Sequence, residues 1–160
     1  MLPVLAFSIV AFSQQIRGHY AIKNVQTGML LRVKDARSEN GTPLVAYSPE
    51  NWKCMTWEFN TTGANVYQLQ NLLTGKTFQP SAMPDAGVGL VEEPMQGSTA
   101  YQQYEFIKDK GESYLIRLKG TNWYMTPEDK NGSTNSRIVL ASRSNGPEQL
   151  WNIYAQEPTM

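Results

Sequence analysis

Apolar and polar residues alternate along several short stretches of the chain. Residues 20–25 alternate in this way, residues 26–28 carry a turn pattern, and an apolar-rich stretch follows at residues 29–33. A period of two is typical of a strand with one buried face, and a Gln-Thr-Gly turn between two such runs predicts a hairpin. The same hairpin pattern returns at residues 67–78.

Two sets of aromatic residues recur with a fixed spacing of 47 positions. They are Trp57, Tyr104 and Trp151 in one set, and Tyr20, Tyr67 and Tyr114 in the other. Two independent registers that share one period indicate a single unit written three times, and a fixed period is the mark of a repeat architecture. The three copies run roughly over residues 17–63, 64–110 and 111–157.

The middle of each copy carries a short apolar run that predicts a third strand. The three runs are Leu44-Val45-Ala46, Leu90-Val91 and Ile138-Val139-Leu140. Copy two is out of step by about one residue here, as a loop deletion would make it. With the opening hairpin and the strand at the closing aromatic, each copy has about four strands. Downstream of residue 13 the chain shows no sustained helical pattern, so the fold class is all-β.

Three units of this kind are too few for a propeller, and an open stack would leave two unpaired edges. Closing the three copies around a pseudo-threefold axis removes the edges and brings the recurring aromatic residues into one shared core. We therefore predict a single β-trefoil domain over residues 14–160.

The bulk composition narrows the function classes. A chain of 160 residues buries roughly 70% of its unfolded surface, so it can hold a core without cross-links. Cys54 is the only cysteine, which excludes an intrachain disulfide. Lys plus Arg and Asp plus Glu both number 14 and no basic run occurs, so we expect no nucleic acid among the partners.

The first 13 residues are almost wholly apolar and stand apart from the repeats. Ala11 and Ser13 are small residues at the −3 and −1 positions of a cut after Ser13, which is typical of a secretory signal. The run is too short to span a bilayer, so we expect no membrane span. The alternative is a first strand that belongs to the domain. We expect a secreted or periplasmic protein if residues 1–13 are a signal peptide, and a cytoplasmic one otherwise.

The sequence offers no catalytic constellation. It has no Ser-His-Asp set, no Gly-rich phosphate loop and no Cys/His cluster with metal-ligand spacing. The carboxylate pairs Glu92-Glu93 and Glu128-Asp129 fall in stretches expected to be loops, and we interpret them as solvated loop charge. We therefore predict a protein that is not an enzyme and that needs no cofactor and no metal.

The repeat carries a recognisable motif. Gln149-Leu150-Trp151, its near match Gln102-Gln103-Tyr104, and the opening stretch 18–24 followed by Thr27-Gly28 resemble ricin-B-type β-trefoil lectins. The resemblance covers roughly residues 17–155. It implies the β-trefoil fold and a module that binds glycans or glycoproteins.

In that family each copy can hold a shallow sugar site with three recurring groups. An aspartate near the end of the second strand binds the sugar hydroxyls, an aromatic after the third strand stacks on the ring, and a polar residue beside Gln-x-Trp completes the hydrogen bonding. In copies one, two and three, the aspartate position falls on Arg32, Gln79 and Thr126. The position of the stacking aromatic falls on Tyr47, Glu93 and Ala141. The position of the polar residue falls on Cys54, Tyr101 and Glu148. Only copy one keeps the aromatic.

Copy one is therefore the best candidate for a carbohydrate site. Tyr47 falls on the family's stacking position, Asn51 and Trp52 lie in the loop that follows, and Asp35 lies in the loop opposite. We predict that Tyr47 or Trp52 stacks on a sugar ring, while Asp35 and Asn51 supply hydrogen bonds. The alternative for Trp52 is a lid folded under its own loop. Trp123 is a second unusual aromatic, and it is interpreted either as a further contact or as cover for the core.

Shallow sites bind weakly, so several sites or a homo-oligomer would add affinity by multivalency. The rival hypothesis is a β-trefoil protein-binding module such as a protease inhibitor. The Pro- and Gly-rich loop Gln79–Gly97 would then contact the partner protein.

Overall fold

The computed structural model describes residues 1–7, 14–97 and 99–160, and these ranges contain twelve strands, four in each copy. They are β1 His19–Asn24, β2 Leu30–Val33, β3 Leu44–Tyr47, β4 Trp57–Gly63, β5 Val66–Asn71, β6 Thr77–Pro80, β7 Leu90–Glu93, β8 Tyr104–Lys108, β9 Tyr114–Leu118, β10 Tyr124–Pro127, β11 Ile138–Ala141 and β12 Trp151–Ala155. The cut predicted after Ser13 lies outside the described residues.

The remaining regular structure consists of four single turns of 3-10 helix. They are η1 Lys34–Ala36, η2 Lys53–Met55, η3 Ala100–Gln102 and η4 Pro147–Gln149. The last three turns each come just before the final strand of a copy. No α-helix occurs in the described part of the chain, and none of its helices could cross a lipid bilayer.

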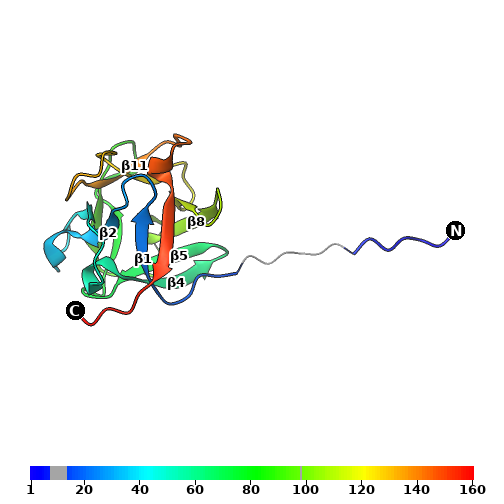
Figure 1. Cartoon of the computed structure of the whole chain (residues 1–160), viewed down its shortest axis with the longest axis horizontal. Helices are drawn as coiled ribbons and strands as arrows, with labels where there is room; N and C mark the ends of the chain where they lie inside the picture. Colours follow the sequence, from blue (N-terminus) through cyan, green and yellow to red (C-terminus); the bar gives the residue numbers. More distant parts are fainter. Residues whose placement is uncertain (8–13, 98) are drawn as a thin grey trace.

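Six strands form a closed ring. The order of neighbours is β1, β4, β5, β8, β9, β12 and again β1, and all neighbours pair antiparallel. Figure 1 shows the closure, in which the first strand lies beside the last, with Tyr20 opposite Ala155 in the register. A ring has no free sheet edge, as the closed threefold arrangement predicted from the sequence requires.

The second and third strands of each copy form three hairpins that meet one another. Their closing pairs are Leu30 with Tyr47, Thr77 with Glu93, and Tyr124 with Ala141. The first members are 47 positions apart, whereas Tyr47 and Glu93 are 46 apart, which confirms the one-residue offset of copy two. Isolated bridges join the third strands around the axis: Pro43 with Val91, Val45 with Arg137, and Gly89 with Val139.

The recurring aromatic residues form the same hydrogen bond in every copy. Each donates a side-chain hydrogen bond to a main-chain carbonyl of the second strand of its own copy: Trp57 Nε1 to Leu31, Tyr104 Oη to Phe78, and Trp151 Nε1 to Met125, each at 3.1 Å. All three aromatic residues are at most 1% exposed. Their predicted place in the core is confirmed, and the β-trefoil fold follows from this threefold pattern.

The turn between the first two strands also repeats. A threonine hydroxyl accepts a hydrogen bond from the amide two residues later, and a nearby glycine adopts a positive φ near 70°; the residues are Thr27, Thr74 and Thr121, with Gly28, Gly75 and Gly120. A left-handed residue is needed to reverse the chain here, and glycine adopts this conformation without a steric cost.

The interpretation of Glu92 as a solvated loop charge is wrong. Glu92 lies in β7, is 1% exposed, and shares the inward face of that strand with Leu90. Neither carboxylate oxygen has a hydrogen-bond partner in the described residues, and burial raises the pKa of this carboxyl. The stretch Gln79–Gly97 is likewise not one loop, because it contains β7. Two adjacent glutamates hide the alternation on which a strand prediction depends.

Replacement of Tyr104 by phenylalanine tests the repeated aromatic hydrogen bond. Tyr104→Phe leaves the carbonyl of Phe78 without this donor, so we expect the free energy of unfolding to fall by about 1–2 kcal/mol. Urea unfolding measures the change. Tyr101→Phe is the matched control, because the Tyr101 side chain is exposed and its hydroxyl contacts only Met83 sulfur, at 3.5 Å. Equal stability of the two variants would contradict this role of Tyr104.

Glu92→Gln tests the buried carboxylate. A raised pKa means that the folded state binds the proton more tightly, so the free energy of unfolding falls as the pH rises above the ordinary value of 4.5. At pH 7 the variant should therefore be more stable than the parent protein, and the difference should disappear below pH 4.5. Urea unfolding at pH 4 and pH 7 measures this, with half-buried Glu93→Gln as control. A gain that is the same at both pH values would be inconsistent with a buried, charged Glu92.

Candidate carbohydrate site in copy one

The loop after the third strand is held by a glutamine in copies two and three. Gln149 donates to the Ser142 carbonyl at 2.8 Å and accepts from the Ser144 amide at 2.9 Å. Gln102 donates to the Pro94 carbonyl at 2.9 Å. The glutamine side chain therefore supplies hydrogen-bond partners to main-chain groups of the loop that have none in the loop itself.

Copy one has Met55 at this position, and its loop is held differently. A thioether cannot donate hydrogen bonds to loop carbonyls, and Met55 is fully buried instead. It belongs to a small apolar cluster, which we call the copy-one cluster: Ala21, Leu30, Cys54 and Met55, with Ala36, Tyr47 and Trp52 packed against them. The loop at residues 48–53 therefore rests on apolar side chains rather than on a buried amide.

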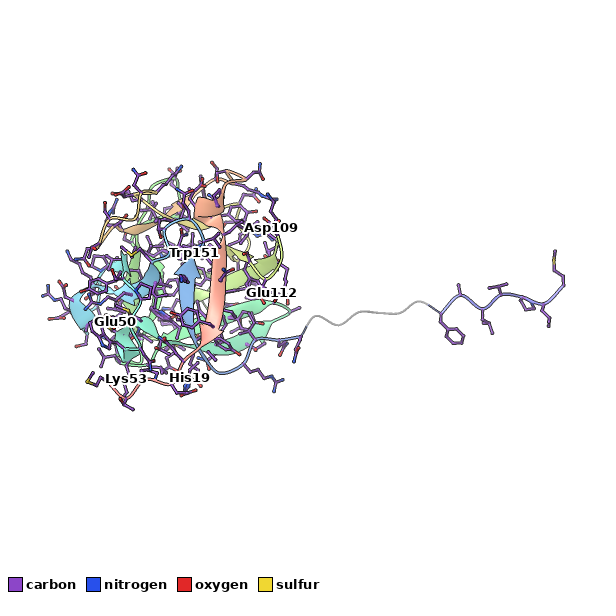
Figure 2. All side chains as sticks on the ribbon, in the orientation of Figure 1. His19, Glu50, Lys53, Asp109, Glu112 and Trp151 are labelled. Atoms are coloured by element: carbon purple, nitrogen blue, oxygen red, sulfur yellow. The ribbon has the colours of Figure 1, made fainter. Side chains whose placement is uncertain are left out.

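A pocket of about 310 Å³ lies beside this cluster. It is lined by Arg32, Ala36, Trp52, Cys54, Leu73 and Met160. Leu73 comes from the first turn of copy two, which is tied to copy one by a 3.1 Å hydrogen bond from Asn71 Nδ2 to the Cys54 carbonyl. Glu50 and Lys53, from the same loop and η2, lie on the left of the body in Figure 2, away from Asp109 and Glu112 on the right.

Two aromatic rings and one guanidinium are in contact beside the pocket, and Arg32 and Trp52 of this group line it. The ring centroids of Tyr47 and Trp52 are 6.2 Å apart at an interplanar angle of 37°. The guanidinium carbon of Arg32 lies 4.1 Å from the Tyr47 centroid and 5.8 Å from the Trp52 centroid. These distances fit cation–π contacts, so the two rings hold Arg32 in place.

The backbone of η1 is strained next to the pocket. Asp35 and Ala36 have φ values of 53° and 54°, in the left-handed region that costs energy for residues other than glycine. This conformation sets Ala36 against the copy-one cluster and leaves the Asp35 side chain exposed. The surrounding packing maintains the strain.

The structure brings together two of the four residues predicted from the sequence. Tyr47 and Trp52 are in contact, and Trp52 lines the pocket. Asp35 and Asn51 are both exposed and are not among the lining residues. Trp123 packs against the main core, as one of its two interpretations expected.

Sequence reasoning missed the role of Arg32, which it treated only as a lost aspartate. The available signal was a single charge inside the apolar strand Leu30–Val33, all of which is buried. It also missed that Leu73 lines the pocket, because Leu73 comes from copy two.

The positions equivalent to Arg32, Tyr47 and Trp52 in the other copies carry neither an aromatic ring nor a cation. Copy two has Gln79, whose side-chain oxygen accepts a hydrogen bond from Gln102 at 3.0 Å. Copy three has buried Thr126 and, in place of Tyr47, Ala141. In copy three Glu148 replaces Cys54, and a hydrogen bond from Ser144 is the main cause that lowers its pKa.

A larger pocket, of about 680 Å³, lies at a different place, where residues 14–16 run along the ring. The Ile16 amide donates to the Tyr67 hydroxyl at 2.8 Å.

Within the described residues, no group of three or more His, Cys, Asp or Glu side chains is placed to hold a metal ion.

The sequence profile of the ricin-type beta-trefoil lectin domain-like family matches residues 7–87, just over half of the 160-residue chain. The chain belongs to this family. No curated protein sequence matches the chain.

Three solved structures, one of them a ricin B-like lectin, share the fold of this chain. The Macrolepiota procera ricin B-like lectin, solved in complex with lactose, has a TM-score of 0.74 and 19% identity, covering 91% of this chain and 99% of that chain. The Rhizoctonia solani agglutinin has a TM-score of 0.76 and 19% identity, covering 89% and 98%. ThreeFoil, a designed threefold symmetric protein, has a TM-score of 0.82 and 18% identity, covering 86% and 98%.

The free energy of unfolding tests whether Gln102 and Gln149 hold the loops after the third strands. Besides Pro94, Gln102 bonds to Gln79, Gln96 and Gln68, so it makes four hydrogen bonds, whereas Gln149 makes two. We expect Gln102→Ala to lower the free energy of unfolding by about 1–2 kcal/mol more than Gln149→Ala. Chemical denaturation of both variants measures the difference. A larger loss for Gln149→Ala would show that these bonds do not hold the loop.

Proposed function

We propose that the protein is a non-catalytic carbohydrate-binding module whose site is the copy-one pocket. One observation carries the proposal: in copy one, a half-buried tryptophan lines a pocket beside Arg32 and Tyr47, the positions that the resemblance to ricin-B-type lectins implies for sugar binding. The positions that match Tyr47 in the other copies carry Glu93 and Ala141, which cannot stack on a ring.

Trp52 is the stacking platform in this proposal. A sugar ring has an apolar C–H face that packs on an aromatic ring, and its hydroxyls need polar partners around the edge. The Arg32 guanidinium already lies over the ring of Tyr47, so Tyr47 acts mainly as a support for Arg32. Trp52 is farther from that cation and itself lines the pocket.

Asp35 and Asn51 complete the proposed site at its rim. Asp35 lies in η1 and Asn51 in the loop at residues 48–53, each next in sequence to a lining residue, Ala36 or Trp52. Both side chains are exposed, so they are available to hydroxyl groups. A volume of about 310 Å³ is at the small end of the range for ligand pockets, which suits one or two sugar rings.

Comparison proteins support this class of ligand. The Macrolepiota procera lectin was solved with lactose and the Polyporus squamosus lectin with a sialylated lactosamine epitope. We further propose that residues 1–13 direct export, which would expose the module to extracellular glycans. A single shallow site binds weakly, so a homo-oligomer would raise the overall affinity.

Substitution of Trp52 tests the proposed site. Trp52→Ala removes the stacking ring, so we expect glycan affinity to fall at least about tenfold, or ~1.4 kcal/mol. A glycan microarray followed by calorimetry with the best ligand measures the loss. Trp123→Ala is the matched control, because Trp123 is also half-buried but packs on the main core. Equal binding by Trp52→Ala and the parent protein would exclude copy one, and a parent protein that binds no glycan would favour the protein-binding rival.

A further inference from the structure

Arg32 is a buried cation without a counterion. It is 9% exposed, and it is the only Lys or Arg among the buried residues of the described chain. None of the ion pairs in the described residues includes it, and its Nε has no hydrogen-bond partner. Arginine is rarely buried to this extent unless it is paired, so the position calls for an explanation.

The two aromatic rings compensate only part of this burial. Cation–π contacts with Tyr47 and Trp52 stabilise the charge, but they satisfy none of the N–H groups of the guanidinium. The terminal Nη atoms are not among the enclosed atoms without partners, and they donate no hydrogen bond in the described part of the chain. Since Arg32 lines the pocket, these donors are available to a ligand there.

No carboxylate of the described residues forms an ion pair with Arg32, and this includes the C-terminal residue Met160, which lines the same pocket and accepts a hydrogen bond from the Lys53 amide. Asp35 is exposed and forms no ion pair, and Glu50 is exposed on the loop before Trp52. Lys53, in η2, lies between the lining residues Trp52 and Cys54 in the sequence but does not itself line the pocket. The pocket therefore combines a fixed, unpaired cation with apolar walls.

We propose, on the basis of the function proposed above, that the copy-one pocket recognises a sugar that carries a carboxylate. The Arg32 guanidinium binds the carboxylate through two N–H groups, while Trp52 packs against the ring of the same sugar. The planar fork of arginine matches a carboxylate, and such charge-assisted pairs are roughly twice as strong as neutral hydrogen bonds.

The exchange of residue type supports an acidic rather than a neutral ligand. An aspartate at this position accepts hydrogen bonds from sugar hydroxyls, whereas a guanidinium only donates. Arginine in place of aspartate thus changes a negatively charged acceptor into a positively charged donor at this one position. The carboxylate of a sialic acid or a uronic acid accepts hydrogen bonds and carries a negative charge. A neutral hexose has no charge to offer, and its hydroxyls are weaker acceptors.

The test uses two pairs of glycans in which only one member carries a carboxylate. Lactose is compared with sialyllactose, and methyl galactoside with methyl galacturonide, by calorimetry with the full chain. We expect the acidic member of at least one pair to bind about tenfold or more tightly, and Arg32→Gln to remove that preference. Arg32→Lys keeps the charge but not the fork, so it should retain only part of the preference.

Arg37→Gln is the matched control for net charge. Arg37 lies just after η1, is exposed, and pairs with Glu39 at 3.6 Å, so its removal changes the total charge equally but not the pocket. The acidic preference should survive this variant. Circular dichroism of Arg32→Gln reports whether the variant is folded.

The outcomes separate this inference from the proposed function. Equal affinity for both members of every pair, or a preference that persists in Arg32→Gln, overturns the role of Arg32. If neutral glycans still bind in a way that depends on Trp52, the proposed function stands without the acidic specificity. If no glycan binds at all, both proposals fail.

Discussion

Each copy depends on one buried hydrogen bond from its closing aromatic residue to a carbonyl of its second strand. The bond joins Trp57, Tyr104 or Trp151 to a residue 26 positions earlier, and so fixes the last strand against the hairpin of the same copy. A buried carbonyl without a donor is costly, so the aromatic must be a residue that also carries an N–H or O–H. Trp and Tyr meet this condition and phenylalanine does not.

The period of 47 positions was enough to predict the fold, because the closing aromatics and the turn threonines depend on local geometry that is the same in every copy. Glu92 could not be predicted, since its burial depends on the partners of β7 rather than on its neighbours in sequence. Only some of the residues that line the pocket could be predicted from the sequence. Trp52 stood out as an aromatic in a polar loop, but Leu73 reaches the pocket from another copy.

The three copies share a framework and differ where the loops meet solvent. Gln102 and Gln149 use a buried amide to hold the loop after the third strand, and Met55 uses apolar packing at the same position. With methionine in place of glutamine, the copy-one loop has no buried amide to bond to, and it packs on aromatic and aliphatic side chains instead. A change at one core position thus accompanies the difference in surface chemistry between copies, while the ring is unaffected.

The pairing of β1 with β12 places the start of the first strand next to the end of the last, with Tyr20 opposite Ala155. A short linker between those two strand ends would therefore join them without disturbing the ring. New ends could then be opened in the exposed tip of the β4–β5 hairpin, near Ala64. Such a circularly permuted chain would begin with the second copy and finish with the first, so the order of the copies along the chain is not fixed by the architecture.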